Sequence, residues 1–110
     1  MEDNNLERLY YFKVTEIPGV GLMVAIADAD VMGVHVVDEE RNIQIIVDKG
    51  FYGDTLAGED RVRSMMMNAD VIVLAGDRVI SMAIDMGLVN PDSILEVKGV
   101  KHVQVYKFKF

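Results

Sequence analysis

The sequence has no cysteine and only two histidines among its 110 residues. Without cysteine, the chain can form no disulfide framework, no thiol nucleophile and no cysteine metal cluster. The two histidines, His35 and His102, lie far apart in the sequence, and neither has a carboxylate at an obvious metal-ligand spacing. We therefore expect no metal site and no cofactor, and we interpret each histidine first as a structural residue.

Long apolar runs are absent as well. No run approaches the roughly 20 apolar residues that a membrane-spanning helix needs. Residues 1–5 are acidic and polar, the reverse of the basic start of a signal peptide. Apolar residues make up 51% of the chain and charged residues 26%. We therefore expect a soluble, cytoplasmic protein that folds as one compact domain over residues 1–110, with a core of its own.

Basic residues are scarce, because 11 lysines and arginines stand against 18 acidic residues and give a net charge of −7. Phosphate backbones favour basic surfaces, so this charge opposes nucleic-acid binding. The best local exception is a set of C-terminal lysines: Lys98, Lys101, Lys107 and Lys109. Basic charge combined with aromatic side chains serves single-stranded RNA. An RNA- or translation-associated module is therefore kept as the alternative function.

Two segments predict amphipathic helices, each with a single apolar stripe. They are Gly58–Asn68 and Asp77–Gly87, and the second follows the buried strand Val71–Ala75. Helices with one apolar stripe must lie on one face of a sheet. The pattern predicts an α+β fold, a two-layer α/β sandwich with a mixed sheet of about five or six strands. The strands Val71–Ala75 and Ile94–Val97 are expected to be parallel, because a helix crosses between them.

Further strands are expected on both sides of these helices. Arg8–Ile17 and Leu22–Ala27 form a hairpin across a Pro/Gly turn. Ile43–Asp48 is almost continuously apolar, so we expect a strand that is central or buried on both faces. The segment His35–Asn42 is expected to be a polar connection, and Lys49–Asp54 a loop.

The run of three methionines at residues 65–67 is expected to belong mainly to the core. Two of the three fit the apolar face of the helix, whereas Met67 points outward. We expect Met66, Val73, Ile80 and Ile45 to be nearly fully buried.

The last strand alternates in character, with valines and then lysines on one face and aromatic residues on the other. The aromatic residues are Tyr106, Phe108 and Phe110. We expect them to pack on the N-terminal strand near Tyr10 and Phe12, while the lysines protect an exposed edge. In the alternative, the last two aromatics are buried against a second copy or a partner. The chain is accordingly expected to be a monomer or a homodimer.

Groups that could carry chemistry have simple structural explanations. Asp28 and Asp30 supply two carboxylates, whereas calcium prefers six to eight oxygens. We therefore interpret Asp28 as the cap of a short helical turn. The serines lie inside helices or in a connection, and Thr55 alone lies in a loop beside another polar residue. We expect no catalytic residue, so a small hydrolase or transferase ranks third among the functions considered.

The strongest site candidate is the segment Phe51-Tyr52-Gly53-Asp54, in which two aromatics stand between glycines. Aromatic side chains in such a loop either fold back over the edge of the core or form a stacking platform. We favour the first interpretation, because exposed paired aromatics are costly unless something covers them.

Several short motifs occur in a characteristic order along the chain. They are Phe51-Tyr52-Gly53, Ala69-Asp70 before an apolar strand that ends at Gly76, Ala83 and Gly87 on one helix, and Gly99-Val100-Lys101-His102-Val103-Gln104. In these motifs the chain resembles an archaeal family of small proteins, domain-of-unknown-function family 424, over nearly its whole length. The resemblance implies a compact two-layer α/β domain with no established activity.

The resemblance also joins the late motif to the aromatic loop in one hypothesis. We predict these binding residues: Phe51, Tyr52, Gly53, Asp54, His102 and Gln104. The predicted function is that of a non-catalytic small binding or adaptor domain. Its partner would be an unknown protein or a small ligand, and no membrane is involved.

Overall fold

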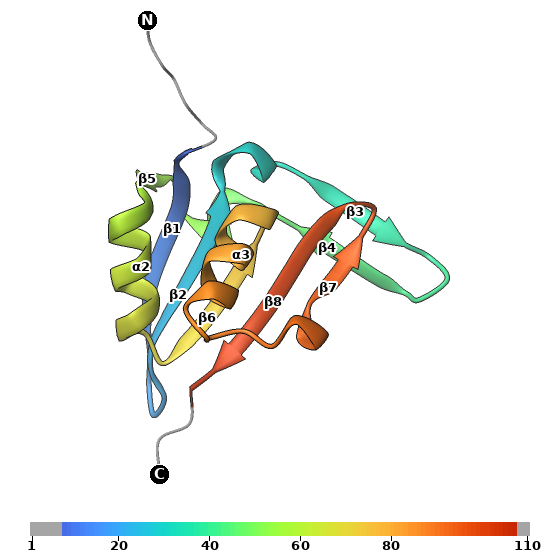
Figure 1. Ribbon diagram of the computed structural model, residues 1–110. Coiled ribbons are helices and arrows are strands. Elements are labelled where there is room, and N and C mark those ends of the chain that lie inside the picture. The colour runs from blue at the N-terminus through green and yellow to red at the C-terminus, as the bar shows by residue number, and fades with distance from the viewer. Residues whose placement is uncertain (1–7, 108–110) are drawn as a thin grey trace, which may run out of the picture.

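The computed structural model describes residues 8–107. Its main element is a six-stranded sheet with the strand order β5-β1-β2-β6-β8-β7 (Figure 1). The strands are β1 (Tyr10–Ile17), β2 (Gly21–Asp28), β5 (Thr55–Ala57), β6 (Val71–Ala75), β7 (Leu95–Val97) and β8 (Val100–Tyr106). Strands β2 and β6 are parallel, and the other paired neighbours in this sheet are antiparallel. The prediction of a mixed sheet with five or six strands is confirmed.

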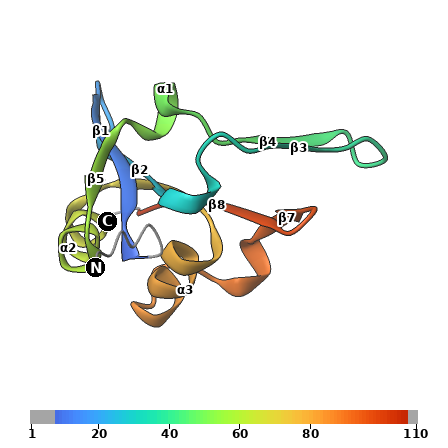
Figure 2. The same ribbon diagram turned by 90° about the horizontal axis from the view of Figure 1, so that it is seen from above.

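The two long helices, α2 (Glu59–Asn68) and α3 (Asp77–Asp85), lie on the same face of this sheet (Figures 1 and 2). Their apolar side chains, Val62 and Met66 of α2 and Ile80 of α3 among them, form one core with the strands. The predicted α+β fold, with both main helices on one face of a mixed sheet, is therefore confirmed. No helix in residues 8–107 is both long and apolar enough to cross a membrane.

The opposite face of the sheet carries a second, smaller layer. It consists of the hairpin β3 (His35–Asp38) and β4 (Ile43–Ile46) and of the one-turn helix α1 (Lys49–Tyr52). Figure 2 shows these elements on the side away from α2 and α3. Ile45 and Val47 are buried here in a second core, between this layer and the main sheet.

Three expectations for this layer were wrong. Residues 43–48 do not form a central strand, because β4 pairs with β3 in a separate two-stranded sheet. The run faces two ways, since Ile45 is buried whereas Ile46 is exposed. Residues 35–42 contain β3, and residues 49–54 contain α1. An apolar run of this length cannot by itself distinguish a central strand from a hairpin laid against a sheet.

Strands β6 and β7 run in the same direction, as predicted from the helix between them. They are not neighbours, because each pairs antiparallel with β8, which lies between them. After α3 the chain passes through the short turn η3 (Pro91–Ser93) and reaches β7 at the edge of the sheet.

The position of β8 corrects the expectation for the C-terminal aromatics. Its neighbours are β6 and β7, so within the described residues β8 does not pair with β1, beside which the aromatics were expected. Tyr106 is 55% exposed, and Phe108 and Phe110 lie outside the described residues. The other face of β8 behaves as predicted, because Val103 and Val105 pack against the core that contains α2 and α3.

At each end of the parallel pair β2 and β6, an aspartate side chain lies directly against a glycine. At one end, the Asp70 carboxylate accepts a hydrogen bond from the Leu22 amide at 2.9 Å. A Cβ on Gly21 would overlap that carboxylate. At the other end, the Asp28 carboxylate occupies the space where a Cβ on Gly76 would lie. At each end, a residue of β2 thus contacts a residue that directly flanks β6.

Candidate functional site

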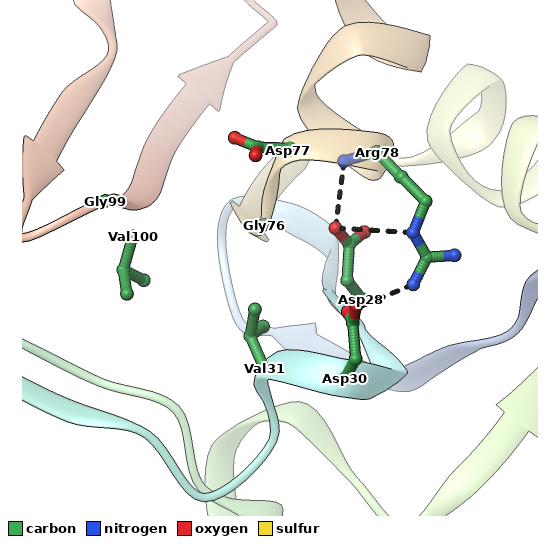
Figure 3. Close-up of a pocket in the computed structure, with 8 residues that line it drawn as sticks. All are labelled: Asp28, Asp30, Val31, Gly76, Asp77, Arg78, Gly99 and Val100. Carbon is green, nitrogen blue, oxygen red and sulfur yellow. Dashed lines mark hydrogen bonds and ion pairs between the residues drawn. The ribbon is translucent and has the colours of Figure 1, made fainter. Parts of the chain in front are cut away.

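A pocket of about 300 Å³ lies where β2 and β6 end and α3 begins (Figure 3). The carboxyl ends of parallel strands are a frequent place for ligands in α/β sheets. Three aspartates and an arginine line this pocket: Asp28, Asp30, Asp77 and Arg78. Whether it is a binding site depends on how far these side chains are already engaged within the protein.

Asp28 is engaged with helix α3. Its buried carboxylate accepts hydrogen bonds from the backbone amides of Arg78 at 2.8 Å and Val79 at 2.9 Å. This corrects the expectation that Asp28 caps the turn η2 (Ala29–Val31), where its side chain makes no capping bond. Burial raises the pKa of Asp28, and the two backbone amides and the Arg78 charge oppose that rise. Because a carboxylate already caps α3, its N-terminus is not open to an anion.

Asp30 and Asp77 are engaged as well. Nη2 of Arg78 lies 3.1 Å from Oδ1 of Asp30, and the guanidinium stacks over the Tyr10 ring at 5.2 Å. Oδ1 of Asp77 lies 3.5 Å from Nζ of Lys101. Across residues 8–107, no three histidine, cysteine, aspartate or glutamate side chains are grouped so that they could hold a metal ion. We interpret this pocket as a structural junction between β2 and α3.

A second pocket, of about 350 Å³, lies between β4, α1 and the strands β6, β7 and β8. We term it the hairpin pocket. Four of the six sequence-predicted binding residues line it: Phe51, Tyr52, His102 and Gln104. The other two, Gly53 and Asp54, line a separate hollow that includes residues of β1. The fold thus brings the two aromatics and the late motif to one place.

Helix α1 holds the two aromatic side chains in position. Oδ1 of Asp48 accepts a hydrogen bond from the Phe51 amide at 2.9 Å and so caps the helix. Gly53 ends it with a φ of +82°, and a Cβ there would overlap the carbonyl oxygen of Phe12. The Phe51 and Tyr52 rings meet edge to face, with centroids 5.0 Å apart. Tyr52, 2% exposed, is the anchor that the favoured interpretation predicted, whereas Phe51 remains 40% exposed.

His102 and Gln104 belong to β8 and, being two residues apart, face the same side of the sheet. His102 stands opposite Leu95 of β7 and Ala75 of β6. Gln104 stands opposite Val73 of β6. Both residues are therefore held by a regular strand and not by a loop.

The polar side chains of the hairpin pocket carry no charge near neutral pH. Burial lowers the pKa of His102, and burial together with the Asp48 charge raises the pKa of Tyr52. In the part of the chain that the structure describes, the side chains of Tyr52, His102 and Gln104 make no hydrogen bond. The pocket therefore combines apolar walls with hydrogen-bonding groups that are available to a ligand.

The lowered pKa of His102 predicts a specific dependence of stability on pH. The unfolded chain takes up a proton near the ordinary histidine pKa of 6.5, whereas the folded chain takes it up only at lower pH. The unfolded state therefore binds more protons, and the free energy of unfolding should fall as the pH decreases from about 6.5 towards the folded-state pKa. Urea unfolding at pH 7.5 and 5.5 measures this loss.

The matched control for this prediction is His102→Gln, which removes the titrating group. The loss between pH 7.5 and 5.5 should be smaller in H102Q than in the wild type. An equal loss in both proteins would show that other groups, and not His102, set the dependence.

Sequence reasoning missed the walls of the hairpin pocket. Gln44 and Ile46 of β4 and Leu95 of β7 also line it. Nothing in the local sequence marks these residues as partners of the aromatic segment. They meet only because the hairpin folds against the main sheet. The single polar residue, Gln44, in the otherwise apolar run of β4 is the one hint in the sequence that this strand has an exposed face.

Among the described residues, the late lysines Lys98, Lys101 and Lys107 lie at separate places in the fold. Nζ of Lys101 lies near Asp77, as described above, and Nζ of Lys107 donates hydrogen bonds to backbone carbonyls at the C-terminal end of α2. Lys98 lies in the turn between β7 and β8 with a φ of +51°. Lys109 lies outside the described residues. These positions do not favour the RNA alternative.

Comparisons with known proteins agree with this architecture. A family model described as "Protein of unknown function (DUF424)" matches residues 15–108. The crystal structure of an uncharacterized conserved protein from Methanopyrus kandleri is similar, with a TM-score of 0.68 and 22% identity over 93% of this chain and 96% of that chain. At that identity, the likeness shows a shared fold. No curated protein matches the sequence. The family model covers most of the chain, and the protein therefore belongs to domain-of-unknown-function family 424.

Proposed function

We propose that this protein is a non-catalytic binding module and that the hairpin pocket is its binding site. The observation that carries the proposal is the combination of Tyr52, His102 and Gln104 in one pocket without hydrogen-bond partners in the described chain. A neutral hydrogen bond contributes roughly 0.5–1.5 kcal/mol. A ligand that supplies partners to these side chains would gain energy of this order from each bond, and Phe51 and Leu95 offer it apolar contact.

The chemistry of the pocket supports binding more than catalysis. A nucleophile needs a base within hydrogen-bond reach, and the base is usually oriented by a third group. Among the described residues that line the pocket there is no serine, threonine, aspartate or glutamate. His102 therefore has neither a nucleophile to activate nor a carboxylate to orient it there. A neutral imidazole in this setting suits recognition of a ligand.

Amide chemical shifts test this proposal directly. We expect a library of small neutral and charged fragments, added to the 15N-labelled protein, to move the resonances of Phe51, His102 and Gln104 before others. In Tyr52→Phe, which keeps the anchor ring, the fragments that shift these resonances should bind more weakly. Met67→Ala, on the exposed side of α2, is the control and should leave binding unchanged. Fragments that bind elsewhere and leave these resonances unmoved would refute the assignment of the pocket.

The RNA alternative is tested separately. Fluorescence anisotropy with mixed RNA oligonucleotides at low and moderate salt should show no binding, because the net charge is −7 and two of the late lysines, Lys101 and Lys107, contact other groups of the protein. Binding that weakens steeply with salt would favour the RNA-associated module instead.

A further inference from the structure

The hairpin pocket also indicates the class of ligand that it fits. We propose that it holds an uncharged planar group whose edge carries both a hydrogen-bond donor and an acceptor, such as a carboxamide or a lactam ring. This inference rests on the function proposed above. It adds the charge, the shape and the hydrogen-bonding character of the occupant.

The shape of the pocket favours a small planar group. The rings of Phe51 and Tyr52 stand at 76° to each other and form a corner. Tyr52 is fixed in the core, while the exposed part of the Phe51 ring can stack on a flat ligand. Leu95 and Ile46 supply aliphatic contacts from two other strands. A volume of about 350 Å³ lies at the lower end of the range for small-molecule sites.

The polar groups favour a ligand that both donates and accepts. A neutral imidazole has one donor and one acceptor, and the amide of Gln104 has both kinds of group. His102 and Gln104 are separated by one residue on β8, so their Cα atoms lie roughly 7 Å apart on the same face. One small ligand can therefore reach both side chains. A purely apolar ligand would leave these groups without partners.

The charges around the pocket disfavour an ionised ligand of either sign. Among the described residues, those that line the pocket include no lysine, arginine, aspartate or glutamate. The charge that acts on Tyr52 is the carboxylate of Asp48, which would repel an anion. A cation would be placed beside the desolvated imidazole of His102 without a carboxylate among the lining residues to pair with it. Burying an ion without a partner is far more costly than burying an amide.

Four probes with the same ring test these features one at a time: benzamide, benzoate, benzylamine as its cation, and toluene. Dissociation constants come from titrations at pH 7.5 followed by 15N amide shifts of the full chain. We expect benzamide to move the resonances of Phe51, His102 and Gln104 and to bind about tenfold more tightly than each of the other three, since it makes two additional neutral hydrogen bonds.

A variant separates hydrogen bonding from simple packing. Gln104→Leu keeps a side chain of similar length on an exposed strand position. It should weaken benzamide about fivefold, whereas toluene, which makes no hydrogen bond, should bind at least as tightly as before. Thr15→Val, a loss of a polar group on β1 away from the pocket, should change neither. Toluene or either ion binding as tightly as benzamide would overturn this inference.

The outcome also separates this inference from the proposed function. If other fragments move the pocket resonances and benzamide does not, the ligand class is wrong and the binding site stands. If no fragment moves them, both proposals fail.

Discussion

Replacing Gly53 with alanine is expected to lower the free energy of unfolding by about 4 kcal/mol or more, the range that marks exceptional substitutions. Two causes add. Gly53 has φ +82° and ψ 175°, a conformation that other residues rarely adopt. A Cβ would also overlap the backbone carbonyl oxygen of Phe12 in β1, which cannot move aside as a flexible side chain would. Chemical denaturation and the near-ultraviolet signal of the tyrosines measure the effect.

Gly33→Ala is the matched control for this substitution. Gly33 also has a positive φ, +92°, but a Cβ there would meet no atom within 4 Å. It should therefore show only the conformational cost, about 1–3 kcal/mol. If G53A does not fold while G33A does, the prediction holds. Equal stabilities of the two variants would show that the contact between α1 and β1 is not as close as described.

Replacing Met66 with alanine is expected to cost about 2–5 kcal/mol, because a large core side chain is removed and leaves a cavity. Met66 is fully buried between α2 and the sheet, whereas its neighbour Met67 is 62% exposed. Met67→Ala should therefore change the free energy of unfolding by no more than about 0.5 kcal/mol. Urea unfolding of the two variants under identical conditions gives both values, and a similar loss in each would contradict the orientation of α2.

The apolar pattern was enough to predict the helix-covered layer. Helices α2 and α3 each bury a single stripe, so the period of apolar residues determines which side chains enter the core. Met66, Val73, Ile80 and Ile45 are all buried, as predicted. Ile45 is buried for a different reason than predicted: it belongs to the β3–β4 hairpin and packs against the face of the main sheet opposite to the two long helices. A correct burial prediction can thus accompany a wrong strand assignment.

The layer on the other face of the sheet, formed by β3, β4 and α1, could not be predicted in the same way. A hairpin that lies against a sheet and a strand inside that sheet need similar apolar residues, and only long-range pairing distinguishes them. The same limit applied to the C-terminus, where alternation predicted which residues share a face but not which strand lies beside β8. Tyr106 is on the predicted face of the strand, but β8 lies beside β6 and β7 and not beside β1, where Tyr10 and Phe12 were the expected neighbours.

The sequence predicted several residues of the candidate site but not how they are arranged in space. Phe51 and Tyr52 were chosen because paired aromatics between glycines are costly unless something covers them. His102 was added because it belongs to a motif of the family that the chain resembles. Their shared pocket depends on β4 and on the position of β8, which local sequence does not specify. Asp28 shows the opposite case, because its cap was assigned to the adjacent turn although its hydrogen bonds go to α3, 50 residues later.

The aspartate–glycine contacts at the two ends of β2 and β6 limit which substitutions related sequences can accept. Each aspartate fills the space that its opposing glycine leaves empty, so the two positions in a pair share one volume. A side chain at Gly76 would need a smaller residue at position 28, and one at Gly21 a smaller residue at position 70. Either would also bear the strain of a positive φ, +113° at Gly76 and +126° at Gly21. Substitutions in contact are not additive. Among related sequences, a relative with a side chain at position 21 or 76 should therefore have a residue smaller than aspartate at position 70 or 28, whereas a relative that has lost the aspartate can keep the glycine.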